Sequence, residues 1–389
     1  MKIVHVIDYF QPKLGYQELN LASEQLKMGH NVFVITSDRY SPAIYDGDAV
    51  KQVLGERIRK SGCYIEEGLP TVRLNTLFEH FPAIWVSGLE KQILKLQPDL
   101  VHVHGVATFS AIRVAGLKKK ANFKLIVDDH MTFGASRSPL RCLYPVFKHT
   151  FAKKILKHSD LLVGVSSTSK QFMYEKYNFP LERIELIPLG ADTTRFHFDP
   201  QARQQIRETF ALSDDAIVFI YAGKVVSVKG PHILIDAAIK LAKQHPNVYV
   251  MVVGNGPDDY IQEMKDKIKK NCLEKHFIFN KAVPNDQLHQ YYSAADVAVW
   301  PREASLSMME AMSCNLPIII SAESEVSERL EYNNGLQYWR EDAEDLRLQM
   351  EKMLDESLRL EMGNNGRRLV EDKLNWTKIS HRFLDEVLK

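Results

Sequence analysis

The sequence predicts an α/β protein made of two domains, each built around a parallel sheet. Three observations support this: the chain has 389 residues, short apolar segments alternate with segments of helical periodicity, and the alternation starts afresh after residue 198. A single core rarely serves so long a chain, so the length favours two cores of roughly 150 to 200 residues. We expect an N-terminal domain over 1–198, a C-terminal domain over 199–370 and a closing helix over 371–389.

The first domain opens with a strand, a helix and a strand. Lys2–Asp8 is a short buried-strand pattern, apolar residues recur at helical spacing up to Gly29, and Asn31–Thr36 is a second strand. Such a unit implies a parallel sheet whose carboxyl edge binds ligands. Further strands are expected at 100–104, 124–128, 161–165 and 183–187.

The second domain repeats the pattern. Its strands are expected at 217–221, 248–253, 277–279, 297–300 and 317–320. In the closing segment one helix face carries Trp376, Ile379, Phe383 and Val387, and this amphipathic helix could pack on either domain.

Composition excludes several classes of protein. The 50 basic and 49 acidic residues nearly cancel, so overall charge gives no reason to expect nucleic acid as a partner. No apolar run approaches the roughly 20 residues of a spanning helix. The four cysteines lack metal-binding spacing and follow no signal segment, which favours reduced thiols in the cytoplasm; they are Cys63, Cys142, Cys272 and Cys314.

Two lysines follow a strand end in the second domain. The apolar strand ends at Gly223, and Lys224 and Lys229 lie in the turn that leads into a helix after Pro231. Glycine lets backbone approach an anion, a helix start offers unpaired N–H groups, and two ammonium groups can balance a diphosphate. We interpret the lysines as an anion site at the carboxyl edge of the sheet. Two solvated loop lysines are the alternative.

The segment Val253–Gly256 also follows a strand and contains two glycines. A dinucleotide-binding fingerprint would need a third glycine at position 259, where the chain has Asp259. The sequence therefore does not favour a dehydrogenase.

A loop of small residues follows the strand at 297–300, and a helix follows the loop. Its backbone N–H groups could hold sugar hydroxyls, and the carboxylate of Glu310 could accept two hydrogen bonds from a ribose diol. Ser307 and Glu310 also have the spacing of a capping box, which would explain the glutamate without a ligand.

Two features of the first domain, Gly15 and His130, are candidates for the same cleft chemistry, and a pair of strand histidines is not. Gly15 lies between the first strand and its helix, where backbone amides could face a ligand, and an ordinary loop glycine is the alternative. His130 follows a strand and is a candidate polar contact or proton carrier. His102 and His104 alternate on one strand, and without a third ligand nearby we interpret them as strand histidines rather than a metal site.

The segment 140–158 is amphipathic and basic. Its apolar residues are interleaved with lysines, and a second cationic run at 118–120 lies nearby in sequence. Such a segment could rest on an anionic membrane surface, and a solvated amphipathic helix is the alternative.

Taken in order along nearly the whole chain, these segments resemble the retaining glycosyltransferases of the GT-B fold, specifically glycosyltransferase family four. The resemblance implies two Rossmann-like domains facing each other across a cleft, with the final helix returning to the first domain. It rests on the start with Gly15, then Pro98–His104, Ile187–Phe196, Gly223–Gly230, Val253–Gly256, Tyr291–Val297 and Glu310–Met312.

The resemblance also implies roles for individual residues. Gly15 would meet the donor phosphate through its backbone, and His130 would lie beside the transferred sugar. Lys224 and Lys229 would carry the diphosphate charge. The other donor contacts would be Val283 at the base, Glu310 at the ribose, and Glu303, Ala304, Ser305, Leu306 and Ser307 at the sugar.

Three positions depart from the family pattern. Lys224 stands where the family usually has arginine, so the charge is kept without the bidentate fork. Glu303 and Glu310 are separated by six residues, whereas seven separate the family's pair. Lys281 replaces the glycine expected before the segment that contacts the base.

The expected function is therefore metal-independent transfer of a sugar, with retention, from a nucleoside diphosphate sugar to an acceptor hydroxyl. The donor would be a UDP or GDP sugar with no further cofactor, and the acceptor a glycan, a lipid-linked molecule or a small molecule in cell-surface polysaccharide, lipopolysaccharide or glycolipid synthesis. We expect a cytoplasmic protein that could contact the inner face of the membrane. An epimerase of the same fold and a catalytically silent binding protein are the alternatives, whereas a phosphorylase would need a cofactor lysine and a longer chain.

Overall fold

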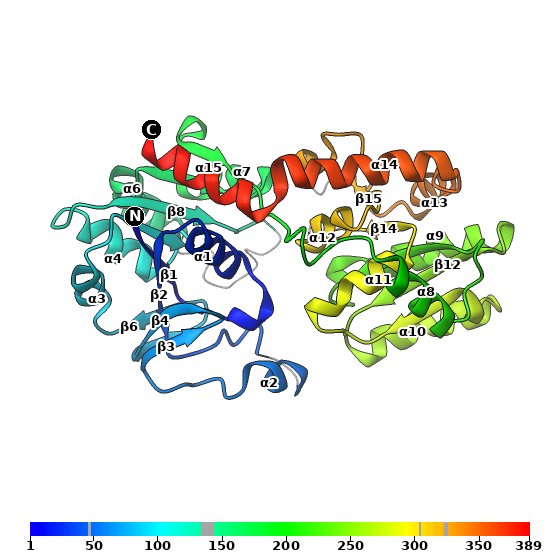
Figure 1. The fold of residues 1–389 in the computed structure, drawn as a ribbon, viewed down its shortest axis with the longest axis horizontal. Coiled ribbons are helices and arrows are strands. Elements are labelled where there is room, and N and C mark those ends of the chain that lie inside the picture. Colours follow the sequence, from blue (N-terminus) through cyan, green and yellow to red (C-terminus); the bar gives the residue numbers. More distant parts are fainter. Residues whose placement is uncertain (46–47, 134–143, 303–304, 323–325) are drawn as a thin grey trace. The chain divides into compact units, whose positions relative to one another are not determined.

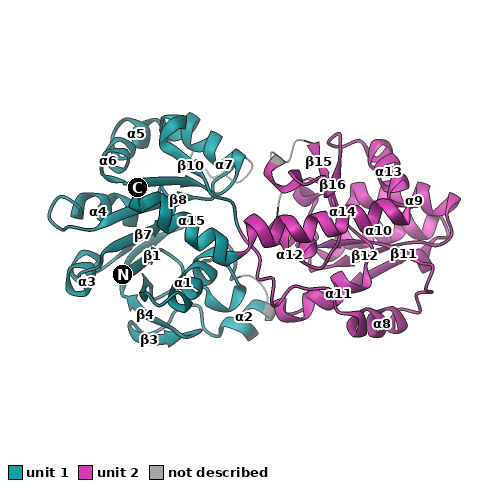
Figure 2. Cartoon of the chain, turned by 45° about the horizontal axis from the view of Figure 1, so that its top comes forward, with its two compact units in different colours: residues 1–189, 376–389 teal, residues 190–375 magenta. Residues whose placement is uncertain are grey.

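The computed structural model describes residues 1–45, 48–133, 144–302, 305–322 and 326–389 (Figure 1). These residues form two units, each with its own sheet and core (Figure 2). Unit 1 comprises Met1–Leu189 and Trp376–Lys389, and unit 2 comprises Gly190–Asn375. Each unit is therefore described separately.

The sheet of unit 1 has the strand order β10-β9-β8-β7-β1-β2-β4-β3, and a separate hairpin joins β5 to β6. Helices α1 to α7 and α15 belong to this unit. The strands are β1 (Lys2–Ile7), β2 (Asn31–Ser37), β3 (Gly62–Glu66), β4 (Leu69–Leu74), β5 (Thr76–His80), β6 (Ala83–Val86), β7 (Leu100–His104), β8 (Lys124–Asp129), β9 (Leu161–Gly164) and β10 (Ile184–Leu186). The helices are α1 (Gln17–Lys27), α2 (Asp48–Leu54), α3 (Leu89–Leu96), α4 (Phe109–Leu117), α5 (Tyr144–His149), α6 (Phe151–His158), α7 (Ser167–Phe172) and α15 (Trp376–Leu388).

One edge of this sheet differs from the expected parallel arrangement. Strand β4 pairs with β2 in parallel, but β3 pairs with β4 in antiparallel register. Neither strand was among those expected from the sequence. Strand β3 is mostly exposed. It therefore lacks the continuous buried apolar run by which the central strands are recognised.

The sheet of unit 2 has the strand order β13-β12-β11-β14-β15-β16, and every neighbouring pair is parallel. Its strands are β11 (Ile217–Ala222), β12 (Val248–Val253), β13 (Phe277–Asn280), β14 (Val297–Trp300), β15 (Ile318–Ser321) and β16 (Gly335–Tyr338). Its helices are α8 (Pro200–Thr209), α9 (Pro231–Gln244), α10 (Asp258–Lys270), α11 (Leu288–Ala294), α12 (Ser307–Ser313), α13 (Ala343–Lys352) and α14 (Glu356–Leu369). The strand order reverses between β11 and β14, and ligands of open α/β sheets bind at such a switch point.

The limits of the units differ from the boundaries expected at 198 and 370. The residues after Leu189 already belong to unit 2, because the Ala191 N–H donates to the carbonyl of Leu374 at 2.8 Å and Arg367 donates to the carbonyl of Phe196 at 3.0 Å. At the other end, the π-helical turn Val370–Leu374 continues α14, so unit 2 extends to residue 375.

Helix α15 packs on unit 1. Its apolar face, which carries Trp376, Ile379, Phe383 and Val387, is buried. The Phe383 ring lies 4.9 Å from the His102 ring, and Thr377 donates a hydrogen bond to Glu24 of α1 at 2.8 Å. Burial of this face anchors the C-terminal helix to the first sheet.

The basic amphipathic segment forms two short helices, α5 and α6, with residues 140–143 outside the described part of the chain. Ala152 and Ile155 are fully buried in unit 1, whereas the Phe151 side chain is 43% exposed. Part of the described apolar face therefore packs on the domain, and part remains exposed. Along the described residues, no helix is both long and apolar enough to cross a bilayer.

Candidate functional site

Lys224 and Lys229 both lie in the loop that follows β11, at the switch point of unit 2. The Tyr221 hydroxyl donates to the Lys224 carbonyl at 2.7 Å, and the Val226 N–H donates to the same carbonyl at 3.0 Å. The Lys224 side chain is exposed, and Lys229 is half-buried at the end of a short 3-10 turn. The backbone of the loop is thus fixed while the Lys224 ammonium remains available to an anion.

Arg302 is a contact of this loop that the sequence did not reveal. It follows β14, forms an ion pair with Glu341 at 2.6 Å, and donates a hydrogen bond to the carbonyl of Ser227. Its guanidinium therefore joins the loop after β14 to the loop after β11. Arg302 is a positioning residue for the lysine loop, and its contact spans 75 residues, which no local motif signals.

Close packing explains the two glycines after β12. A Cβ on Gly254 would lie 1.8 Å from the carbonyl oxygen of Gly223, and one on Gly256 would lie 1.8 Å from that of Val225. The Val225 N–H donates to the carbonyl of Asn255 at 2.8 Å. These glycines allow one loop to rest on the other and are not part of a dinucleotide fingerprint.

The loop after β13 is tied to the same assembly. The Gly254 N–H donates to the carbonyl of Asn280 at 3.0 Å, and the Asn255 side chain accepts from the Ala282 N–H at 3.0 Å. Val283 comes next and is half-buried. The loops after β11, β12 and β13 therefore support one another at the carboxyl edge. Val283 lies in the third of these loops, directly after the residue that contacts Asn255.

Glu310 is buried in α12, on the other side of the switch point. Its exposure is 6%, and Asn285 donates to its carboxylate at 3.3 Å. Burial raises the pKa of Glu310 to about 7, although the Asn285 hydrogen bond and the charge of Arg195 oppose the shift. A buried carboxylate with spare acceptor capacity can receive hydrogen bonds from a diol.

The capping-box interpretation of Glu310 is wrong. Helix α12 is preceded by Leu306 at its N-cap, which makes no side-chain capping bond. Ser307 instead donates to the carbonyl of Ala222 at 3.3 Å and to the hydroxyl of Ser305 at 2.8 Å. Because Ser307 lies one position inside the helix, its spacing to Glu310 is not that of a capping pair.

Arg329 fixes the small-residue loop before α12. It is buried, and its guanidinium donates to the Ser305 carbonyl at 2.6 Å. Burial lowers the pKa of Arg329 to about 10, so the group is still charged at neutral pH. Leu306 and Ser307 follow in described positions, whereas Glu303 and Ala304 lie outside the described residues.

In unit 1, Gly15 and His130 lie on the loops after β1 and β8. Gly15 has a φ of 69°, in the left-handed region, and ends a 3-10 turn; its carbonyl accepts from Asn20 at 2.9 Å. The His130 side chain is 42% exposed, and its Nε2 is 3.9 Å from Oδ1 of Asp128. Both residues therefore lie at the carboxyl edge of the first sheet.

Asp128 is the centre of a buried polar cluster that the sequence did not reveal. Its Oδ2 accepts from His102 at 3.0 Å, from His104 at 2.9 Å and from Gln17 at 3.1 Å. Burial would raise the pKa of Asp128, but His104 and His102 outweigh it and hold that pKa well below its ordinary value. Asp128 Oδ1 has no hydrogen-bond partner among the described residues, and the imidazole of His130 lies near it.

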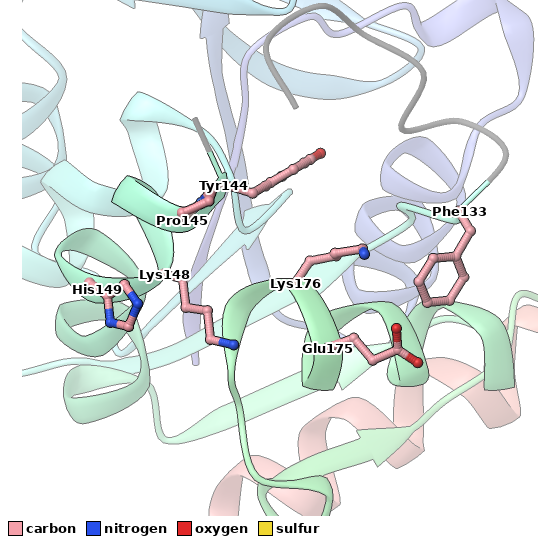
Figure 3. A pocket seen from close by; sticks show the side chains of 7 residues that line it. All are labelled: Phe133, Tyr144, Pro145, Lys148, His149, Glu175 and Lys176. Carbon is pink, nitrogen blue, oxygen red and sulfur yellow. The ribbon is translucent and has the colours of Figure 1, made fainter. Parts of the chain in front are cut away.

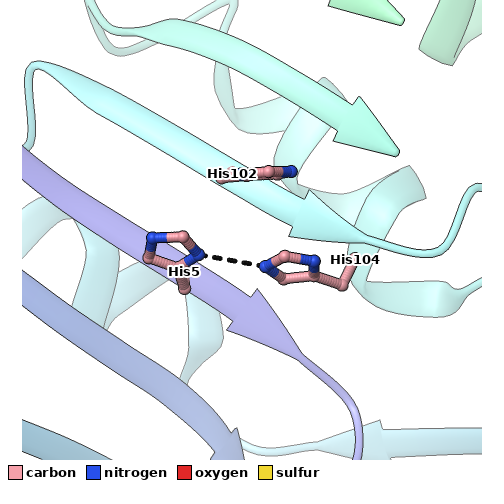
Figure 4. A group of neighbouring side chains, drawn as sticks. All are labelled: His5, His102 and His104. Carbon is pink, nitrogen blue, oxygen red and sulfur yellow. Dashed lines mark hydrogen bonds between the residues drawn. The ribbon is translucent and has the colours of Figure 1, made fainter. Parts of the chain in front are cut away.

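The expectation that no third ligand lies near His102 and His104 is wrong, because His5 of the neighbouring strand β1 joins them. His5 Nδ1 lies 3.0 Å from His104 Nε2, and the planes of the two rings differ by 13° (Figure 4). The ring centroids are 5.3 Å apart, so the two nearly parallel rings meet edge to edge rather than stack. A proton can therefore be shared between the two facing nitrogens. The His102 ring stacks on the His104 ring, with 4.3 Å between the centroids. The nitrogens of His102 therefore do not point toward the contact between His5 and His104.

The three imidazoles therefore do not fit a metal in this arrangement, because metal-bound lone pairs must converge on one point about 2 Å away. They fit a hydrogen-bonded chain instead. The amide oxygen of Gln25 lies 2.8 Å from His5 Nε2, so that nitrogen carries the hydrogen and His5 Nδ1 accepts from His104. His104 is then an imidazolium that also donates to Asp128.

Comparison with known proteins identifies the family. Two family models match the chain in succession: "Glycosyltransferase Family 4" matches residues 18–195, and "Glycosyl transferases group 1" matches residues 202–369. The chain belongs to this glycosyltransferase family. The match accounts for both units of the glycosyltransferase and places the boundary between its two halves close to the one in the structure.

Two relatives show what kinds of transferase this glycosyltransferase resembles. It is 28% identical over 180 residues to the GDP-mannose-dependent alpha-(1-6)-phosphatidylinositol monomannoside mannosyltransferase of Mycolicibacterium smegmatis, covering 44% of this chain and 46% of that one. It is 24% identical over 337 residues to the phosphatidylinositol N-acetylglucosaminyltransferase GPI3 subunit of Saccharomyces cerevisiae, covering 82% and 67%. The match thus spans about half the length of the first relative.

A solved structure establishes the fold class. The glycosyltransferase superimposes on HepE of Anabaena, determined in complex with UDP, with a TM-score of 0.76 and 17% identity over 100% of both chains. At this identity the likeness speaks for the fold alone. The fold is GT-B, with two Rossmann-like sheets, as the sequence predicted.

Proposed function

We propose that this glycosyltransferase transfers a sugar from a nucleoside diphosphate sugar to an acceptor hydroxyl with retention at the anomeric carbon. The observation that carries the proposal is the switch point of unit 2, where the lysine loop after β11 and the buried Glu310 after β14 flank adjacent strands. Cations suited to a diphosphate and a carboxylate suited to a ribose thus lie at one sheet edge.

The chemistry assigned to these residues is electrostatic. As the bond to the donor sugar breaks, negative charge grows on the leaving diphosphate, and Lys224 and Lys229 stabilise it together with the Gly15 backbone. The sugar centre that remains resembles an oxocarbenium ion and is attacked by the acceptor hydroxyl from the face the leaving group vacates, and the hydroxyl proton passes to the leaving diphosphate. His130 lies beside the sugar, and Ser305, Leu306 and Ser307 contact its hydroxyls; Glu303 and Ala304, the other two predicted sugar contacts, lie outside the described residues.

The donor is a UDP or GDP sugar with Val283 against the base, and the reaction needs no metal or further cofactor. The relatives favour an acceptor that contains a lipid or a glycan, because those named above act on phosphatidylinositol derivatives. We place the enzyme in the cytoplasm at the inner face of the membrane, with the basic segment 140–158 as the contact. Retained turnover in the presence of a chelator tests whether the reaction needs a metal. Flotation with anionic vesicles tests the membrane contact.

The test of the site is a pair of substitutions, Lys224→Ala and Lys229→Ala. Each should reduce turnover about a hundredfold, the typical cost of losing one charge-stabilising donor. The matched control is Lys269→Ala, an exposed lysine of α10. Full turnover in both loop variants would remove the lysines from the mechanism.

Donor chemistry without acceptor separates this proposal from its rivals. A panel of UDP, GDP, ADP and dTDP sugars in a thermal-shift assay identifies the donor, since a ligand at a hundred times its dissociation constant adds about 2.7 kcal/mol of stability. The enzyme is expected to hydrolyse the donor slowly and to release free nucleoside diphosphate. Binding without release would indicate a silent binding protein, and conversion of the donor to its epimer would indicate an epimerase. The anomeric configuration of the product, measured by NMR, decides retention.

A further inference from the structure

A pocket of about 580 Å³ lies in unit 1 between α5 and the π-helical turn Met173–Tyr177. Figure 3 shows Lys148 on α5 and Lys176 on the turn, with Phe133 and Tyr144 among the other lining side chains. The pocket therefore combines two amines with two aromatic rings, brought together from segments far apart in sequence.

Neither lysine of this pocket forms an ion pair with another described residue. Both are half-buried, and the described part of the chain provides no carboxylate within ion-pair distance of either. Glu175 is the acid among the described lining residues, and its carboxylate accepts from the Gln171 side chain at 2.9 Å. Two ammonium groups that share a recess repel each other, and an anion between them relieves the repulsion.

The walls of the pocket indicate an anion attached to a less polar body. The Lys176 ammonium lies 5.4 Å from the centroid of the Phe133 ring, and the Tyr144 ring packs edge-on against Phe172 at 5.8 Å. These rings are partly exposed and offer apolar contact beside the charges. A free inorganic ion would use the lysines and leave the aromatic walls empty.

The number of charges favours phosphate over carboxylate. The described lining contributes two lysines, whereas a single carboxylate carries only one negative charge. A phosphate can carry up to two negative charges, which two lysines on separate elements can balance. We propose that this pocket binds the phosphate group of the acceptor, an inference that rests on the proposed transferase function.

A phosphate of this kind could belong to a lipid headgroup or to a soluble sugar phosphate, and both offer the pocket the same chemistry. The intact chain should therefore be titrated with inorganic phosphate, with sn-glycerol 3-phosphate, and with vesicles of phosphatidylcholine with and without phosphatidylglycerol. Saturable binding of glycerol phosphate, tighter than that of inorganic phosphate, supports the pocket with a soluble source. Binding of the anionic vesicles alone supports it with a lipid source, provided that the variants below weaken it.

The variants are Lys148→Gln and Lys176→Gln, each expected to weaken binding about tenfold, because hydrogen bonds to charged groups are strong. Glu175→Gln removes the nearby negative charge and should tighten binding about threefold. Lys91→Gln, an exposed lysine of α3 in the same unit, is the control and should change binding less than twofold.

Two results would overturn the inference: no binding of any of the probes, or a loss in Lys91→Gln as large as in Lys148→Gln, which would mean diffuse surface attraction. Donor hydrolysis by the unaltered chain separates this failure from that of the proposed function. If hydrolysis is present and phosphate binding is absent, only the acceptor pocket is wrong. If hydrolysis is absent, the transferase assignment itself fails.

Discussion

Replacing Glu310 by glutamine should make the free protein more stable while it weakens donor binding. The carboxyl is 6% exposed and receives one hydrogen bond, from Asn285 at 3.3 Å. Burial raises its pKa from 4.5 to about 7, so above pH 7 the folded chain holds a charge that water would hold more favourably. A difference of this size corresponds to about 3 kcal/mol of lost stability.

The pH dependence follows from the direction of the shift. Below pH 4.5 the carboxyl is protonated in both the folded and unfolded chains, so it contributes no penalty. The penalty grows as the pH rises from 4.5 to about 7 and is constant above that. Glu310→Gln should therefore gain about 3 kcal/mol over the original chain at pH 8 and almost nothing at pH 4.5.

The assay is urea unfolding at pH 8, pH 6 and pH 4.5, supported by thermal unfolding, in which the gain at pH 8 corresponds to roughly 6 to 12 °C for a unit of this size. Glu361→Gln, on the exposed face of α14, controls for the loss of one negative charge. The same variant should bind the donor more weakly if the carboxylate receives the ribose. The reasoning fails if Glu310→Gln is no more stable at pH 8 than at pH 4.5, relative to the original chain.

Two further substitutions test the packing and hydrogen bonding at the carboxyl edges of the two sheets. Gly254→Ala would place a methyl group 1.8 Å from the Gly223 carbonyl, and it should cost roughly 3 kcal/mol by urea unfolding and lower donor affinity. Unchanged stability would show that the two loops are not in tight contact. His104→Gln should cost about 3 kcal/mol at pH 6, because it leaves Asp128 short of its charged partner. Burial acts to lower the pKa of His104, but Asp128 outweighs it and raises that pKa, so the contribution is complete below 6.5 and is lost as the pH rises through the raised value. A cost that grows from pH 6 to pH 9 would contradict the imidazolium.

The central strands of unit 2 could be predicted because they are apolar on both faces. Strands β11, β12 and β14 lie within one residue of the expected bounds, since a buried parallel strand is a continuous apolar run. Strand β16 (Gly335–Tyr338) was missed because it is short and half-polar at the sheet edge. The antiparallel β3 was missed for the same reason.

Contacts between loops could not be predicted, because they depend on which loops the sheet brings together. Nothing near Arg302 in sequence signals that it donates to Ser227, and the two glycines after β12 owe their role to a carbonyl more than 30 positions away. His5 looks like one more residue of a buried strand until β1 pairs with β7 and sets it beside His102 and His104.

Strand order explains how the residues of the proposed donor site can meet in one domain. Lys224 and Glu310 belong to segments separated by several helices and strands, yet β11 and β14 are direct neighbours, with Phe219 paired to Val297. The chain first builds β12 and β13 on one side of β11 and then crosses to the other side. The loops after β11 and β14 consequently lie next to each other at the carboxyl edge, where the Arg302 guanidinium joins them through the Ser227 carbonyl. A cationic loop and a buried carboxylate thus follow neighbouring strands, so charges of opposite sign lie at one sheet edge, as the proposed donor, with a diphosphate at one end and a diol at the other, requires.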